Sequence, residues 1–285
     1  MDGLRLPDPR NNVIKPGSLE SILEVPGEAA ASQAFRDVPH AEVRQIWYQS
    51  RVLKRARRMH VYTPLGYDAS ANRFPVFYLL ASGDTDAGWT VTGRAGFILD
   101  NLPADRKAAP MIVMMPDAAT ARVAPTQMRA GAGPEDYREG DLFGEALHTD
   151  IMPLVEGRYR VRPGPQNRAI AGLSNGGMQV LWYGLPHPET FAYFGIFSSG
   201  QSPKGNTALL KVAAPFFADP AKTNKSVKLV WIAYGRTDIA NANSQNLSGL
   251  LAEKGIRHEA KETPGGHTWI NWRAYLYQFA QLLFR

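Results

Sequence analysis

The feature that most constrains this 285-residue chain is a tight turn around one serine, Gly172-Leu173-Ser174-Asn175-Gly176, followed directly by Gly177. Apolar residues 168–171 before the turn are typical of a buried strand, and residues 178–183 after it are typical of a helix. A turn this tight strains the backbone of the serine, and side chains two residues to either side would clash. The pattern predicts a hydroxyl exposed at the carboxyl edge of a sheet, beside the first N–H groups of a helix.

Apolar strand-like runs alternate with helical patterns through most of the chain. Residues 74–80 and 110–115 are continuous apolar runs, as expected for central parallel strands that are buried on both faces. Further strands are expected at residues 168–171, 191–197, 227–234 and 257–261, and helices at 94–101, 141–159, 178–183, 206–217, 241–254 and 269–284. This alternation predicts an α/β class, with a mostly parallel central sheet and helices on both faces.

The first part of the chain has a different character. Residues 1–40 lack clear periodicity and are rich in Pro, Gly, Ala and Ser, which indicates a linker or a strap lying over a domain. Residues 42–50 and 57–63 are expected to pair as antiparallel strands. One domain is therefore expected over residues 41–285. The long segment 118–137 has little periodicity, and loops of this length tend to be functional.

Composition excludes several functions. The chain has no cysteine, so disulfides, thiolate metal sites and a cysteine nucleophile are excluded. No metal or cofactor is predicted, because metal-ligand spacings and phosphate loops are absent. No apolar run approaches the roughly 20 residues that span a bilayer, and no signal-peptide pattern is seen, so no membrane association is predicted.

The net charge of +6 is concentrated around one turn. The basic residues are Arg51, Lys54, Arg55, Arg57 and Arg58. A solvated hairpin explains them better than a nucleic-acid surface, because they surround a turn and no nucleic-acid motif accompanies them. Attraction to an acidic polysaccharide stays open.

A serine hydroxyl needs a base and a carboxylate to become a nucleophile. His267 follows the last expected strand within Pro264-Gly265-Gly266-His267, where paired glycines let the loop bend back toward Ser174. Asp238 follows the apolar strand that contains Trp231. The alternatives are a surface-loop role for His267 and a helix N-cap role for Asp238, with Asp219 as the main competing acid. We interpret Ser174, His267 and Asp238 as a catalytic triad.

The same reaction needs N–H donors for the oxyanion that develops. One is predicted to be the backbone N–H of Asn175, and the second that of Ser82, with Gly83 as the next choice. Trp89 lies close after that loop and Trp269 lies beside His267, so both could bind substrate by stacking on an acyl group or a sugar. Packing inside the protein is an equal alternative for both tryptophans.

Taken together, residues 36–285 resemble the putative-esterase family of α/β-hydrolases, and more narrowly the feruloyl and acetyl-xylan esterases of carbohydrate esterase family 1. The motifs that carry the resemblance are Arg58-Met-His-Val-Tyr-Thr-Pro64 with Gly66-Tyr67, Pro75-Val-Phe-Tyr-Leu-Leu80, Gly93-Arg-Ala-Gly-Phe-Ile-Leu-Asp-Asn101, Ala171-Gly-Leu-Ser-Asn-Gly-Gly177 and Gly265-Gly-His-Thr-Trp-Ile-Asn-Trp-Arg273. The resemblance implies an α/β-hydrolase fold, a Ser174–Asp238–His267 triad and hydrolysis through an acyl-enzyme. Two departures stand out: the family's usual His-Gly is missing before Ala81-Ser82-Gly83, and Asn175 replaces the usual Met.

The expected function is a serine esterase that releases hydroxycinnamates such as ferulate from plant arabinoxylan. An acetyl-xylan esterase, a sugar acyltransferase and a non-catalytic carbohydrate-binding relative are the alternatives. The expected partner is a feruloylated or acetylated plant polysaccharide or oligosaccharide, not a nucleic acid, and homo-oligomerisation stays open. The resemblance also implies secretion or a periplasmic location. Residues 1–40 resemble the connector that follows an N-terminal module in such esterases, so we expect such a module to be missing here.

Overall fold

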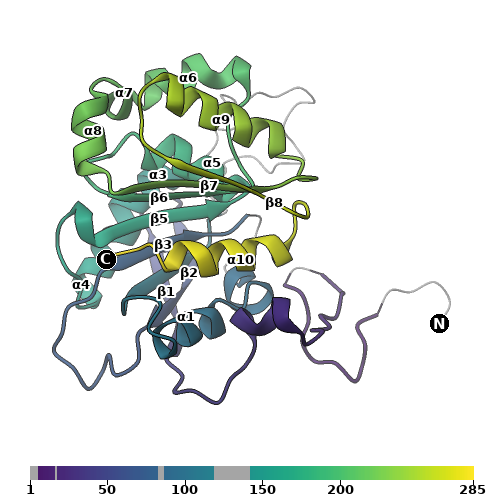
Figure 1. Ribbon diagram of the computed structural model, residues 1–285. Helices are drawn as coiled ribbons and strands as arrows, with labels where there is room; N and C mark the ends of the chain where they lie inside the picture. The colour runs from purple at the N-terminus through teal and green to yellow at the C-terminus, as the bar shows by residue number, and fades with distance from the viewer. Residues whose placement is uncertain (1–5, 17, 83–86, 119–141) are drawn as a thin grey trace.

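A computed structural model describes residues 6–16, 18–82, 87–118 and 142–285, which contain an eight-stranded sheet (Figure 1). The strand order is β1-β2-β4-β3-β5-β6-β7-β8. β1 and β2 are antiparallel to each other, β2 is antiparallel to β4, and all other neighbours are parallel. The predicted fold class is confirmed. The strands are β1 Glu42–Ser50, β2 Arg55–Thr63, β3 Val76–Leu80, β4 Ile112–Pro116, β5 Arg168–Leu173, β6 Tyr193–Phe197, β7 Leu229–Gly235 and β8 Glu259–Thr263.

The central strands are hydrophobic because both faces of the sheet are covered. Every residue of β3, β4 and β6 is buried, as the continuous apolar runs predict. The last strand begins two residues later than the expected 257–261, at Glu259. Its side chains are almost all exposed, so the polar edge strand carries no apolar pattern that could mark its ends.

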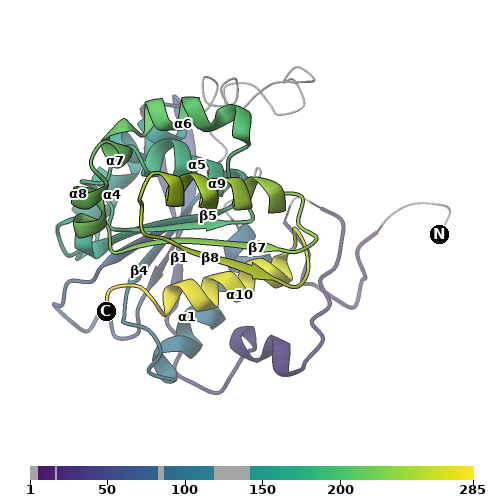
Figure 2. The same ribbon diagram turned by 45° about the horizontal axis from the view of Figure 1, so that its top comes forward.

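Helices cover the two faces of the sheet (Figures 1 and 2). α1 and α10 pack on one face through one apolar cluster, and the other α-helices of the described residues lie on the other side. The α-helices are α1 Ala95–Ala104, α3 Phe143–Ala146, α4 Met152–Arg158, α5 Asn175–Gln179, α6 Asn206–Val212, α7 Ala214–Phe217, α8 Pro220–Ser226, α9 Asn241–Glu253 and α10 Trp269–Ala280. Single π-helical turns occur at Gly88–Thr92, Leu147–Ile151 and Val180–Gly184, and 3₁₀ turns at Glu28–Gln33, Pro165–Asn167 and Pro203–Gly205.

Two expectations change in detail. The single helix expected over residues 141–159 is a succession of α3, a π-helical turn and α4. The helix expected over residues 206–217 is divided into α6 and α7, with a break at Ala213. Pro215 follows this break, and a proline is tolerated in the first turn of a helix but not in its interior. Of the long loop predicted at 118–137, only residue 118 belongs to the described part of the chain.

The N-terminal segment is attached to the α1–α10 side of the domain by a buried arginine. The guanidinium of Arg273 in α10 donates to both carboxylate oxygens of Glu24, at 2.7 and 3.1 Å, and to the carbonyl of Thr92 at 2.7 Å. Arg94, at the start of α1, lies 3.5 Å from the same carboxylate. A bidentate pair of this kind adds both energy and fixed geometry. Glu24 therefore connects the N-terminal segment to two helices at once.

Replacing Glu24 with glutamine is expected to lower the free energy of unfolding by about 1–2 kcal/mol, because the buried Arg273 loses its charged partner. Burial tends to raise the pKa of Glu24, but Arg273 and Arg94 outweigh it and hold that pKa below its usual value. The stabilisation is therefore full above about pH 4.5 and is lost as the pH falls through the lower folded-state pKa. Urea unfolding of the wild type and Glu24→Gln at pH 7 and at pH 3 tests this, and the difference in free energy of unfolding should be smaller at pH 3. Lys15→Ala, which removes an exposed ion pair with Glu20, is the control and should change little.

Candidate active site

The turn around Ser174 joins β5 to α5 in a conformation that only its glycines permit. Ser174 has φ 51° and ψ −118°, which is strained for a residue with a side chain. A Cβ on Gly172 would lie 2.3 Å from the carbonyl carbon of Gly176, and one on Gly176 would lie 2.7 Å from the carbonyl oxygen of Ala81. These close approaches explain the glycine spacing, and they bring the turn against the loop that follows β3.

The three side chains predicted as a triad lie in one hydrogen-bonded chain. The Ser174 hydroxyl donates to His267 Nε2 at 3.0 Å, and His267 Nδ1 donates to Asp238 Oδ1 at 2.8 Å. A carboxylate can only accept, so Nδ1 carries the proton and Nε2 is left as the base. The Asp238 side chain is fully buried and that of His267 is 21% exposed. The arrangement can remove a proton from Ser174.

Chain topology explains how distant residues meet. Ser174 follows β5, Asp238 follows β7, and the two strands run parallel on either side of β6, so their carboxyl ends share one edge. His267 lies between β8 and α10. Its loop turns at Gly265, with φ 87°, and the Gly265 carbonyl accepts from the N–H of Thr237 at 3.0 Å.

The competing interpretations of the two acids are decided by their hydrogen bonds. α9 begins after Ala240 with no side-chain cap, and Asp238 instead accepts from the N–H of Ala240 at 2.8 Å, two residues ahead. The N-cap alternative for Asp238 is therefore wrong. Asp219 caps α8 by accepting from the N–H of Lys222 at 3.0 Å.

Ser198 is a site residue that the sequence reasoning missed. It follows β6, between the strands that lead to Ser174 and Asp238, with φ 48° and 1% exposure. Its hydroxyl and Asp238 Oδ2 are both buried, and neither atom has a partner at hydrogen-bond geometry in the described part of the chain. The hydroxyl is nevertheless close enough to act on the pKa of the Asp238 carboxyl. Burial tends to raise the pKa of Asp238, but the Ser198 hydroxyl, the Ala240 N–H and His267 outweigh it and hold that pKa below its usual value. A serine pair directly after a buried strand was the available signal.

Ser198→Ala is expected to lower kcat by about 3- to 10-fold, because the buried hydroxyl that helps to hold the pKa of Asp238 down disappears and that pKa rises. The acid limb of the kcat profile should therefore move to higher pH. Ser199→Ala is the matched control, since this neighbouring serine is also buried but does not contribute to the Asp238 pKa. An unchanged pH profile for Ser198→Ala would show that Ser198 serves only packing.

Of the residues predicted to donate an N–H to the oxyanion, Asn175 and Ser82 belong to the described part of the chain. Asn175 is the first residue of α5, where a helical N–H has no partner within its own helix. Ser82 follows β3, and the backbone of Leu80 and Ala81 lies against Gly176. The loop after β3 therefore lies against the turn that carries Ser174. Gly83, the second choice, lies outside the described residues.

The two tryptophans predicted to bind substrate differ in how much of each side chain is exposed. Trp89 is 1% exposed, its indole N–H donates to the carbonyl of Leu80 at 3.0 Å, and its ring meets Trp269 edge-on at 5.3 Å. The substrate-binding prediction for Trp89 is thus corrected to packing, with the ring supporting the loop after β3. Trp269 is half-buried. Trp272, also missed, packs edge-on against the His267 ring at 5.0 Å.

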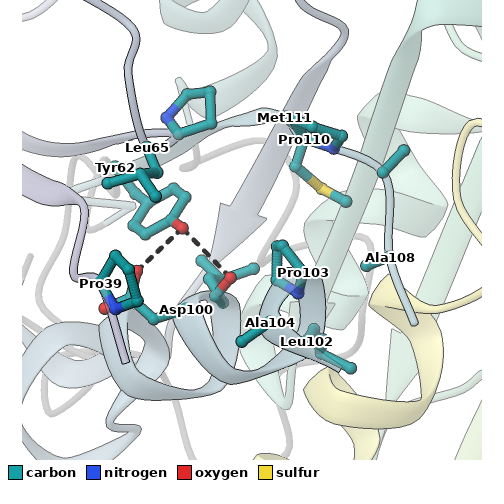
Figure 3. A pocket seen from close by; sticks show the side chains of 13 residues that line it. Pro39, Tyr62, Leu65, Asp100, Leu102, Pro103, Ala104, Ala108, Pro110 and Met111 are labelled. Atoms are coloured by element: carbon teal, nitrogen blue, oxygen red, sulfur yellow. Dashed lines mark hydrogen bonds between the residues drawn. The ribbon is translucent and has the colours of Figure 1, made fainter. Parts of the chain in front are cut away.

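A separate cavity of about 220 Å³ lies away from these residues (Figure 3). It is lined by Tyr62, by the end of α1 and by Met111, which precedes β4. The Tyr62 hydroxyl contacts the carboxylate of Asp100 at 3.0 Å. Because Met111 precedes a parallel strand, this cavity opens at the amino edge of the sheet, opposite Ser174.

Within the described ranges, no cluster of three or more histidines and carboxylates suits a metal ion. No helix in the same ranges is long and apolar enough to cross a membrane.

Comparisons with known proteins find esterases among the relatives of this chain. The chain is similar to an "Endo-1,4-beta-xylanase/feruloyl esterase" of Xylanibacter ruminicola, at 28% identity over 93% of this chain and 35% of that protein. An esterase of Mycobacterium tuberculosis is 24% identical over 79% of this chain and 56% of its own length. The chain thus spans between about a third and a little over half of the curated relatives it matches.

Solved structures share the fold. A CE1 ferulic acid esterase from Anaeromyces mucronatus in complex with ferulic acid has a TM-score of 0.73 and 24% identity, covering 89% of this chain and 95% of that one. An S-formylglutathione hydrolase of Staphylococcus aureus has a TM-score of 0.62 and 14% identity, covering 87% and 100%. The family model described as "Putative esterase" matches residues 50–282. Because that match spans most of the chain and includes the serine, the acid and the histidine, this protein belongs to the putative-esterase family of α/β-hydrolases.

Proposed function

We propose that this esterase is a feruloyl esterase, which releases hydroxycinnamates from arabinoxylan through an acyl-enzyme. The observation that carries the proposal is the Asp238–His267–Ser174 hydrogen-bonded chain, which ends beside the first N–H of α5. The choice of substrate is supported by the feruloyl esterase named among its relatives and by the ferulic acid esterase of the same fold. Since the polymer is a cell-wall component, we also propose that the enzyme acts outside the cytoplasm.

In the proposed mechanism, Ser174 Oγ attacks the ester carbonyl while its proton moves to His267 Nε2. The carbonyl oxygen becomes an oxyanion, which the N–H of Asn175 and an N–H of the loop after β3 stabilise. The tetrahedral intermediate collapses to an acyl-serine, and the departing sugar hydroxyl takes the proton from His267. Water then attacks the acyl-serine by the same steps and releases the acid. Asp238 stays ionised throughout and stabilises the imidazolium.

The proposal is tested by comparing kcat/KM on methyl ferulate, methyl sinapate and acetylated xylan. A preference for the hydroxycinnamate esters is expected. A strong preference for acetylated xylan would replace the feruloyl assignment with an acetyl-xylan esterase. Product analysis in the presence of a sugar acceptor separates hydrolysis from acyl transfer, since transfer would yield an acylated sugar in place of free acid.

A further inference from the structure

An exposed tryptophan stands on the edge hairpin of the sheet, outside the catalytic site. Trp47 in β1 is 61% exposed. Its cross-strand neighbour is Arg58 of β2, whose guanidinium carbon lies 5.4 Å from the centre of the indole. A cation placed over an aromatic ring is held by the ring's electrostatic field. The ring is therefore held in place by Arg58, while most of the side chain still faces solvent.

The residues around Trp47 combine an aromatic surface with polar amide groups. Alternation along β1 places Gln45, Trp47 and Gln49 on the same face, and all three are exposed. The two amides lie about 7 Å from Trp47 along the strand, one on each side. Sites for uncharged polar molecules combine an apolar or aromatic surface with a few placed donors and acceptors. A sugar ring, with an apolar face and a rim of hydroxyls, fits an indole flanked by amides.

This surface lies at the edge of the sheet formed by the carboxyl ends of the parallel strands, which is also the edge that carries the catalytic serine. Met59 of β2 pairs with Pro116 at the carboxyl end of β4, and the N–H of Asp117 donates to the carbonyl of Arg58. β1 is four strands away from β5 in the sheet order. At the usual strand spacing this separates Trp47 from Ser174 by about 19 Å. Several linked sugar units span such a distance, so one polysaccharide chain can reach both places.

The charge of the hairpin favours the same ligand. Lys54 and Arg55 are exposed at the turn that connects β1 and β2. Cations beside a binding surface attract chains that carry acidic substituents, and salt weakens this attraction. Xylans substituted with uronic acids have this character.

We propose that Trp47, together with Gln45, Gln49 and Arg58, forms a second binding site for the polysaccharide that carries the ester. The proposal rests on the proposed function, because it assigns the substrate's main chain to this surface. Trp47 acts on the affinity for polymer and takes no part in the bond that is broken. Small esters that cannot reach the hairpin are handled by the catalytic site alone.

The experiment compares Trp47→Ala and Trp47→Phe with the wild type on methyl ferulate and on feruloylated arabinoxylan. Trp47→Ala should leave methyl ferulate turnover unchanged, which also shows that the variant is folded. On the polymer, kcat/KM should fall by about 5- to 10-fold, mainly through KM, with Trp47→Phe in between. Leu65→Ala is the matched control, since Leu65 is 60% exposed but lies beside the cavity at the opposite edge. Leu65→Ala should leave kcat/KM unchanged on both substrates.

Binding to insoluble arabinoxylan, measured in a Ser174→Ala background, separates this proposal from the proposed function. Loss of binding in Ser174→Ala/Trp47→Ala supports the second site even if the wild type fails to release ferulate. Equal binding and equal polymer kinetics with and without Trp47 would overturn it, and would assign the tryptophan to hairpin stability or to contact with another protein module.

Discussion

Ser174→Ala is expected to reduce kcat on methyl ferulate by roughly 10⁴- to 10⁶-fold, because no other group lies where the hydroxyl meets the base. The hydroxyl donates to His267 at 3.0 Å from a backbone conformation that two close-packed glycines maintain. Alanine keeps the same backbone and removes only the oxygen. Steady-state kinetics measures the loss, and mass spectrometry after a slow acylating ester should find an adduct on Ser174 in the wild type alone.

Circular dichroism and the melting temperature of Ser174→Ala provide the control for this prediction. Both should stay near the wild-type values, since the variant creates no cavity of consequence. If Ser174→Ala keeps more than a few per cent of the wild-type rate, or if the acyl group is found on another residue, the mechanism proposed above is wrong.

Asp238→Asn is expected to have the second large effect, lowering kcat by roughly 10⁴-fold. Asp238 accepts from His267 Nδ1 at 2.8 Å and thereby keeps Nε2 free to take the proton of Ser174. An asparagine amide can donate to Nδ1, which favours the tautomer that carries its proton on Nε2. That tautomer cannot serve as a base. The rate loss should appear in kcat, with a smaller change in KM for methyl ferulate.

Asp219→Asn is the matched control, because asparagine is as good a helix cap as aspartate and this residue only caps α8. It should leave kcat unchanged. Similar losses in both variants would point to a general effect of charge, and a wild-type rate in Asp238→Asn would remove Asp238 from the triad.

Much of the site could be predicted from sequence because its constraints are local. The spacing of Gly172 and Gly176 around Ser174 follows from close backbone approaches within a few residues. Asp238 and His267 each stand just after a strand-like run, and the carboxyl ends of parallel strands share an edge. Strand order was not needed to see that these positions could meet.

Other parts of the site could not be predicted, because their roles depend on contacts between distant segments. The sequence left Trp89 equally suited to stacking on substrate and to packing, and its bond to the Leu80 carbonyl decides for packing. Ser198 acquires its role only because β6 lies between β5 and β7. Glu24 lies in a segment without periodicity, and its partner Arg273 is 249 residues away.

The sequence by itself determined the class of fold, the strained serine and the order in which acid and base follow it, since turn sterics and strand patterns are properties of short segments. Tertiary structure decided which tryptophan is buried, which hydroxyl supports the acid and where the N-terminal segment is attached. It also placed Trp47 at the edge shared with Ser174. These outcomes depend on strand order and on which side chains exclude water from each other, and no short segment of the chain contains that information.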